Sequence, residues 1–312
     1  MFKSVKGLLG HSMSFEIKGM IAPVFTPVNE EGQPDFVNIP DYLTFLQNNG
    51  VKGILVGGTT GEAASFTAVE RMNVFRAFRK VAKALGLKII LQVGGASLPD
   101  VITMAQCAEE MKADAIMTLP ELYFKPQSTE QLVNYLKIVS KAAPSLPLIY
   151  YHFPMMSGVQ VKNVPEFFKM ASSIINFKGM KADLDVALQL QSQLRTDQRI
   201  FIGNHMLAPA AVVGFDSSIA TVTNLFPGLV ESLIEVSKAG KLEKIKPYQM
   251  KLNALVAAIT SHGEFLPAMK AAMPMVTGIN VGAPRRPLEP LTKQKMNELH
   301  DSLKKLNFGR MK

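Results

Sequence analysis

Short apolar runs alternate along the chain with longer segments in which apolar residues recur three or four positions apart. The apolar runs predict strands at 20–25, 53–58, 88–93, 115–118, 148–151, 174–181, 199–203 and 217–221. The helical spacing between them predicts helices at 35–49, 68–85, 98–112, 129–142, 164–171, 184–194 and 206–213. Strands that are almost continuously apolar are typical of a parallel sheet buried on both faces.

Eight strand–helix units of this kind predict an α/β chain folded as a closed (β/α)8 TIM barrel. An open, doubly wound sheet is the alternative, but no glycine fingerprint for a nucleotide follows a predicted strand. After residue 225 only helical patterns remain. We therefore expect a flexible leader over residues 1–15, the TIM barrel over 16–225, and a C-terminal helical extension of the same domain over 226–312.

Composition limits the class of protein and its partners. The formal net charge of +9 is compatible with simple solubility or with attraction of anionic substrates. Basic residues do not interleave with aromatic ones, so we expect no nucleic-acid partner. No run of about 18 apolar residues occurs, so we expect no membrane span. The basic residues of segment 1–15 fit a transit peptide or a disordered leader, and we favour the leader and a cytoplasmic location.

Neither a disulfide nor a metal site is expected. Cys107 is the only cysteine and stands in a predicted helix, where we expect a packed thiol and not a nucleophile. The histidines lack the spacing of metal ligands; they are His11, His152, His205, His262 and His300.

The ends of the strands carry the candidate chemistry, because active sites of TIM barrels lie at the carboxyl ends of the strands. Lys181 ends the sixth strand. A lysine that attacks a carbonyl must be uncharged, and burial among strand residues favours that form; the alternative is an ordinary lysine facing solvent. Tyr151 ends the fifth strand with a hydroxyl that can move a proton. Tyr150 alternates with it, so only one of the two can face the barrel interior.

The turn Gly58-Thr59-Thr60-Gly61-Glu62 follows the second strand. It offers consecutive backbone N–H groups and two hydroxyls with little side-chain obstruction, which suits a carboxylate. A tight turn without a ligand is the alternative.

Four motifs together carry a family resemblance. They are GGTTGE at 57–62, YYHFPMMSGV at 150–159, FKGMK at 177–181 and VTGINVGAPRRPL at 276–288. In this order they resemble the dihydrodipicolinate synthase / N-acetylneuraminate lyase superfamily over about residues 16 to 306. The chain is most similar to the animal-type N-acetylneuraminate lyase branch, because His152 and Pro154 follow the tyrosine pair. The synthase branch has an arginine in the following loop, where this chain has Met155 and Met156.

The resemblance implies a role for each matching residue. Lys181 would form a Schiff base with pyruvate or with the open-chain keto acid, and Tyr151 would shuttle the proton. Thr59 and Thr60 would contact the pyruvoyl carboxylate and complete a hydroxyl relay. Tyr123 would reach the neighbouring subunit's site in a homotetramer. No cofactor is implied. The implied substrate-binding residues are Thr59, Thr60, Gly58, Asp183, Gly203, His205 and Thr221.

Departures from the family pattern concern the rest of the substrate. In the lyase branch the seventh strand ends in a glycine, an aromatic residue and two acids that bind the sugar tail, whereas here Gly203 is followed by Asn204-His205-Met206. Each lost hydrogen bond costs about 1 kcal/mol, so we do not expect ordinary sialic acid to be the best substrate. Asp183 replaces a small hydroxyl residue. It either shares the cavity with Lys181, where it would raise the lysine pKa unless His205 pairs with it, or caps the following helix and points outward.

Three functions are compatible with these observations. The first is a class I (Schiff-base) aldolase or lyase that cleaves or forms a 2-oxo acid with pyruvate as one component. The second is a condensation or dehydration of a different 2-oxo acid through the same imine. The third is an inactive barrel used as a binding or structural protein, against which the retained Lys181, Tyr151, Thr59 and Thr60 argue.

Overall fold

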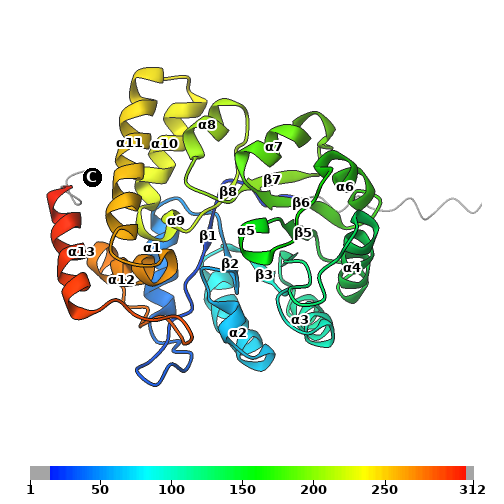
Figure 1. The fold of residues 1–312 in the computed structure, drawn as a ribbon, viewed down its shortest axis with the longest axis horizontal. Coiled ribbons are helices and arrows are strands. Elements are labelled where there is room, and N and C mark those ends of the chain that lie inside the picture. Colours follow the sequence, from blue (N-terminus) through cyan, green and yellow to red (C-terminus); the bar gives the residue numbers. More distant parts are fainter. Residues whose placement is uncertain (1–14, 307–312) are drawn as a thin grey trace, which may run out of the picture.

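Eight parallel strands form a closed barrel in the computed structural model, which describes residues 15–306 (Figure 1). Neighbouring strands pair in chain order, and β8 closes the barrel by pairing with β1. The predicted TIM barrel is confirmed. The strands are β1 (Met20–Pro23), β2 (Gly53–Val56), β3 (Lys88–Gln92), β4 (Ala115–Thr118), β5 (Leu148–Tyr151), β6 (Phe177–Ala182), β7 (Arg199–Ile202) and β8 (Ser218–Ile219).

Helices surround the barrel, and the last ones gather on one side of it (Figure 1). The helices that follow β1 to β7 are α1 (Ile39–Asn48), η1 (Ala63–Ser65), α2 (Ala68–Ala84), α3 (Leu98–Glu110), α4 (Thr129–Ala142), α5 (Pro154–Ser157), α6 (Val164–Ala171), α7 (Leu184–Leu190), η2 (Gln191–Gln193) and α8 (Leu207–Val212). Those that follow β8 are α9 (Val222–Leu225), α10 (Pro227–Lys238), α11 (Leu242–Thr260), α12 (Phe265–Thr277) and α13 (Lys293–Lys305).

The core consists of two apolar layers that the strand pleat separates. Alternate strand residues face the helices, and the others fill the barrel interior. Phe15 and Ile17 belong to the interior layer, and the Phe15 ring packs edge-on against Phe201 with the centroids 6.1 Å apart. Phe15 therefore packs with the barrel, and the rest of the predicted leader, residues 1–14, lies outside the described residues. The interior layer also contains Ile21, Leu55, Ile90, Ala115, Met117, Ile149, Tyr151 and Ile219.

The C-terminal helices pack directly on the barrel. Helix α10 packs against α8 and α11, and α12 packs against α9 and α13. Gln249 of α11 donates to the His205 carbonyl at 3.0 Å and accepts from the Ala208 N–H at 3.1 Å. The loop after β7 is therefore held by a helix of the extension. Within residues 15–306, no helix combines the length and apolar character needed to cross a bilayer.

Several predicted boundaries differ from the structure by a few residues, and two of these differences have a clear physical reason. Strand β6 begins at Phe177 and not at residue 174, because the Asn176 side chain donates to the carbonyls of Ala143 and Leu146 and joins the preceding segment to the α4–β5 connection. Helix α1 begins at Ile39 and not at residue 35, because Pro40 occupies its first turn and disfavours helical backbone before it. The short helices α5 and α9 were not predicted.

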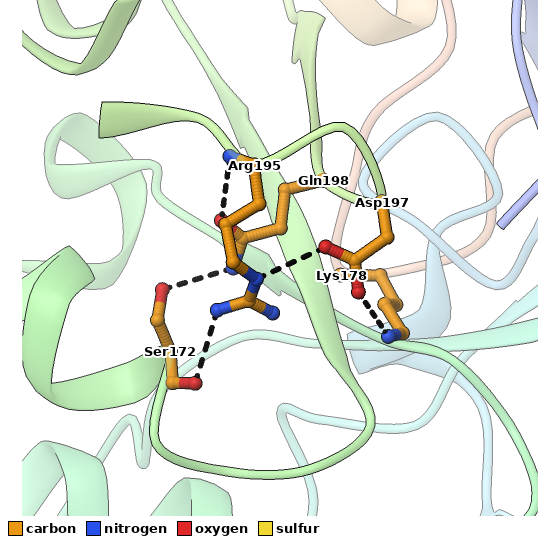
Figure 2. A network of polar contacts seen from close by, with 5 residues as sticks. All are labelled: Ser172, Lys178, Arg195, Asp197 and Gln198. Atoms are coloured by element: carbon orange, nitrogen blue, oxygen red, sulfur yellow. Dashed lines mark hydrogen bonds and ion pairs between the residues drawn. The ribbon is translucent and has the colours of Figure 1, made fainter. Parts of the chain in front are cut away.

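A polar network ties the amino ends of β6 and β7 together (Figure 2). The Lys178 amine donates to Asp197 at 2.6 Å, and the Arg195 guanidinium donates to the other oxygen of that carboxylate at 3.0 Å. Arg195 also donates to the Ser172 carbonyl at 3.2 Å, which links the network to the end of α6. These charges lie at the amino end of the barrel, away from the carboxyl ends of the strands where active sites form.

A register shift at the start of β6 determines which way the side chains after it point. Leu148 pairs with Phe177 but Ile149 pairs with Gly179, so one residue of β6 is left unmatched. Gly179 has φ of +147°, and a Cβ there would lie 1.8 Å from the Arg199 carbonyl oxygen. Only glycine fits this position.

Replacement of this glycine should be costly. Gly179→Ala is expected to lower the free energy of unfolding by about 2 kcal/mol or more, because it combines strained backbone with a clash against backbone atoms. Gly86→Ala is the control, because Gly86 has φ of +70° but open space around it; its cost should be about 1 kcal/mol. Urea unfolding followed by circular dichroism would measure both, and equal losses would contradict the argument.

Candidate active site

Lys181 and Tyr151 lie side by side at the carboxyl end of the barrel. The two residues pair in register between β5 and β6, and both are buried, with exposed fractions of 6% and 4%. The Lys181 amine lies 4.0 Å from the centroid of the Tyr151 ring. Tyr150 instead packs on the outer side of the strand against Phe167, with centroids 5.1 Å apart. Of the two tyrosines, Tyr151 is therefore the one that faces the interior.

Gly203 provides the space that the lysine side chain occupies. It follows β7, and a Cβ built on it would lie 3.3 Å from Cε and 3.6 Å from Cγ of Lys181. A larger residue would press on the methylene groups that carry the amine. Gly203 thus contributes to the site by leaving room for the lysine.

The turn after β2 borders the same interior. Thr59 Oγ1 lies 3.2 Å from the Tyr151 hydroxyl, and Thr60 Oγ1 lies 2.8 Å from Thr221 Oγ1. Within residues 15–306, no hydrogen bond is donated by the backbone N–H groups of Thr59, Thr60 and Gly61. Three consecutive N–H groups without a partner in this part of the chain are typical of a site that binds an anion.

These groups can perform carbonyl chemistry together. The turn can hold a carboxylate with its N–H groups, and the Lys181 amine stands within the same barrel mouth as a nucleophile. The Tyr151 ring lies against the Lys181 amine and its hydroxyl lies against Thr59, so the hydroxyl is placed to move a proton. Within the described chain, no group of three or more His, Cys, Asp and Glu side chains could hold a metal ion.

Asp183 does not have the partner that the sequence suggested. Its carboxylate accepts a hydrogen bond from the Asn204 amide at 2.9 Å, and the alternative pairing with His205 is not observed. The outward capping alternative is not observed either, since the side chain makes no capping bond to α7. Partial burial raises the pKa of Asp183, nearby Asp185 adds to this, and Asn204 and Lys181 oppose it. Asp183 therefore stands half exposed at the mouth, within electrostatic reach of Lys181.

The two histidines nearest the mouth are uncharged at neutral pH. Burial lowers the pKa of His152 to about 4, and the His152 backbone N–H donates to the Lys181 carbonyl at 2.9 Å. Burial also lowers the pKa of His205, which lies half buried on the loop after β7. Neither histidine can supply a positive charge to the site at that pH.

Tyr123 is not packed into the mouth of its own barrel. Its side chain is 86% exposed on the loop between β4 and α4. The ring contacts that of Phe124 edge-on, with centroids 5.0 Å apart, and Phe124 is 85% exposed as well. Within one chain, this predicted catalytic residue is thus separate from the Lys181 group.

Sequence reasoning missed the polar residues behind the turn. Glu62 is buried and forms an ion pair with Lys270 of α12, with 2.6 Å between Oε1 and the amine. The Thr26 hydroxyl donates to the Gly61 carbonyl at 2.7 Å. The position of Glu62 at the end of a glycine-rich turn was the one available signal in the sequence. Nothing in the helical pattern around Lys270 indicated a buried charge.

This chain is similar to known proteins over most of its length. Residues 16–306 match the model of the dihydrodipicolinate synthetase family. The N-acetylneuraminate lyases of Rattus norvegicus and Homo sapiens are each 30% identical to this chain, over 94% of it and 93% of their own length. The solved structure of Proteus mirabilis N-acetylneuraminate lyase superposes with a TM-score of 0.87 at 30% identity and covers 94% of this chain and 99% of its own.

Removal of the Asp183 charge should change the pH dependence of adduct formation at Lys181. A carboxylate near Lys181 favours the charged ammonium form, and only the uncharged amine attacks a ketone. Asp183→Ser is therefore expected to lower the pH at which half-maximal adduct forms with added pyruvate. Borohydride trapping across pH 5 to 10 would measure this. An identical profile in wild type and variant would show that the Asp183 charge does not affect Lys181.

Proposed function

The chain belongs to the dihydrodipicolinate synthetase family, and from that premise we propose that it is a class I aldolase whose Lys181 forms a Schiff base with a 2-oxo acid. The reaction is cleavage or formation of a carbon–carbon bond, with pyruvate as one component. The enzyme acts on a small molecule and resembles N-acetylneuraminate lyase in its pyruvate-handling part.

One arrangement carries this proposal. The Lys181 amine lies 4.0 Å from the Tyr151 ring centroid, and the Tyr151 hydroxyl lies 3.2 Å from Thr59 Oγ1 of the turn with free N–H groups. A nucleophile, a proton carrier and a carboxylate cradle therefore share one barrel mouth. A 2-oxo acid needs these three groups close together, because its ketone and carboxylate are adjacent.

Schiff-base formation is the first step. The carboxylate rests on the N–H groups of Thr59, Thr60 and Gly61, which brings the adjacent ketone to the lysine. The uncharged Lys181 amine attacks the ketone carbon, and the oxygen leaves as water, so that a protonated imine remains.

Cleavage follows from the electron demand of that imine. The Tyr151 oxygen accepts the proton of the C4 hydroxyl while its own proton passes through the Thr59 hydroxyl to the substrate carboxylate that rests on the turn. The C3–C4 bond breaks, its electrons move to form an enamine on Lys181, and C4 leaves as an aldehyde. The proton returns to C3, and water hydrolyses the imine to release pyruvate and the free amine.

The aldehyde part of the substrate would contact other residues than the pyruvate part does. The mouth carries Asp183 bonded to Asn204, with His205 half buried beside them. One carboxylate can accept hydrogen bonds from hydroxyl groups, but the two acids of the sugar-binding loop are absent here, since Gly203 is followed by Asn204-His205-Met206. We therefore favour a sialic-acid relative with an altered tail; condensation or dehydration of another 2-oxo acid on the same imine is the second candidate.

An inactive binding barrel is less consistent with the geometry. A barrel without turnover has no need for a lysine buried to 6% exposure or for three consecutive free N–H groups beside it. Both features have an energetic cost unless a ligand uses them.

Assembly is a second part of the proposal. Exposed apolar side chains lie on the loop after β4 and on the short helix α5, and these two segments are neighbours, since a Cβ on Gly158 would lie 3.1 Å from Cε of Lys125. They are Tyr123, Phe124, Met155 and Met156. Such side chains are typical of a surface covered by another subunit, so we propose a homotetramer in which Tyr123 reaches the neighbouring site. A cytoplasmic location remains a prediction.

Trapping with borohydride tests the nucleophile. Incubation with pyruvate and reduction should add the mass of a reduced pyruvate imine to the peptide that contains Lys181. Lys181→Ala should give no adduct. An adduct on another lysine, or none in the wild-type chain, would overturn the proposed function.

The proton carrier is tested by removal of one hydroxyl. Tyr151→Phe should still form the pyruvate adduct but should cleave its substrate about 10² to 10⁴ times more slowly, which is the range for loss of a general acid–base group. Cleavage of N-acetylneuraminate can be followed by coupled detection of pyruvate. Equal turnover in wild type and variant would assign the proton transfer elsewhere.

The assembly is tested by a charge on the exposed aromatic pair. Phe124→Asp should shift the molecular mass measured by light scattering from a tetramer to a smaller species. Val37→Asp is the control, because Val37 is 79% exposed and lies before α1. A wild-type monomer, or a tetramer that Phe124→Asp leaves intact, would contradict this part of the proposal.

A further inference from the structure

Glu62 ends the carboxylate-binding turn in an unfavourable backbone conformation. Its φ is +56°, in the left-handed region that side-chain-bearing residues avoid, and it is buried with an exposed fraction of 4%. A residue holds such a conformation only where its surroundings fix it. The question is which groups fix Glu62.

Both carboxylate oxygens of Glu62 are held by the C-terminal extension. The Lys270 amine of α12 donates to Oε1 at 2.6 Å, and the Arg285 backbone N–H donates to Oε2 at 2.5 Å. The side chains of Glu62 and Lys270 are both fully buried. The turn is therefore anchored by residues more than 200 positions later in the chain.

Lys270 reaches the turn by a second route. Its amine also donates to the Thr26 carbonyl at 3.0 Å, and the Thr26 hydroxyl donates to the Gly61 carbonyl at 2.7 Å. One ammonium group thus holds the last residue of the turn directly and the preceding one through Thr26. The N–H groups of Thr60 and Gly61 lie between these anchors.

We propose that Lys270 and Glu62 are positioning residues that set the direction of the turn N–H groups and thereby the affinity for the substrate carboxylate. This inference rests on the proposed function, because it assumes that the turn binds the carboxylate of a 2-oxo acid. A buried ion pair adds little stability over an apolar pair of the same volume, so geometry is what this pair supplies.

The barrel contains a matched control for this pair. Lys178 and Asp197 also lie 2.6 Å apart, and the Lys178 side chain is only 4% exposed (Figure 2). This pair stands at the amino ends of β6 and β7, where it contacts no part of the turn. Lys178→Met and Lys270→Met each remove a buried ammonium group, but only the second removes an anchor of the turn.

Trapping by borohydride at increasing ketone concentration separates affinity from reactivity. Lys270→Met should raise the pyruvate concentration for half-maximal trapping about tenfold, while the trapping rate at saturation changes by less than about threefold. Hydroxyacetone, a ketone without a carboxylate, should show no such shift. Lys178→Met should leave the half-saturating pyruvate concentration unchanged.

Arg285→Met is a milder variant that tests the same proposal if Lys270→Met does not fold. The Arg285 guanidinium pairs with Glu70 at 2.7 Å and lies 4.4 Å from the Phe66 ring centroid, and its side chain is 21% exposed. Arg285→Met loosens the segment that donates to Glu62 without burying an unpaired charge. It should shift half-saturation in the same direction as Lys270→Met, by a smaller factor.

Each outcome bears on a separate claim. Folded Lys270→Met or Arg285→Met with unchanged half-saturation for pyruvate, or with an equal shift for hydroxyacetone, would overturn the positioning role and leave the aldolase intact. A wild-type chain that traps no pyruvate would overturn the proposed function and this inference together. Circular dichroism and thermal unfolding identify variants that are folded.

Discussion

The pleat of a closed parallel barrel leaves only two directions for a strand side chain: into the barrel or toward the helices. Tyr151 and Lys181 both take the inward direction at the carboxyl ends of adjacent strands, and so they meet. The unmatched residue in β6, with Gly179 beside it, is what brings Lys181 into step with Tyr151. Everything proposed for the chemistry depends on this shared direction, because neither residue alone can both activate a ketone and move a proton.

The sequence predicted the barrel and the reactive pair because both depend on local pattern. Strands β4 and β5 have the predicted limits, since their apolar runs are bounded by clear turn residues. The limits of β6 and α1 were harder to predict, because a distant side-chain contact of Asn176 and the position of Pro40 determine them. The sequence left Asp183 open between the cavity and an outward helix cap, and it did not indicate the contact with Asn204, since Asn204 and His205 are adjacent and only the loop geometry selects between them. Lys270 was missed entirely, because a buried charge in a helix leaves no periodic signal.

The proposed site divides into a part that handles the 2-oxo acid and a part that recognises the aldehyde. In our proposal the N–H groups of the turn hold the carboxylate, the buried Lys181 amine attacks the ketone, and the buried Tyr151 hydroxyl moves the proton. The rest of the mouth is built from the loops after β6 and β7, where Asp183 and Asn204 are partly exposed. Loops tolerate substitution more readily than the strands that carry them. A change of aldehyde specificity can therefore occur without loss of Schiff-base chemistry.

The contact between Glu62 and Lys270 spans 208 positions of the chain. During synthesis, strands β1 to β8 leave the ribosome before α12, so a nascent chain can close its barrel while the turn after β2 still lacks its anchors. In this order the turn after β2 becomes able to bind an anionic substrate only when α12 and the segment after it pack against it. A truncated translation product that ends before α12 would carry the nucleophile but not the anchors of the turn, and by the same reasoning it would bind 2-oxo acids more weakly than the full chain.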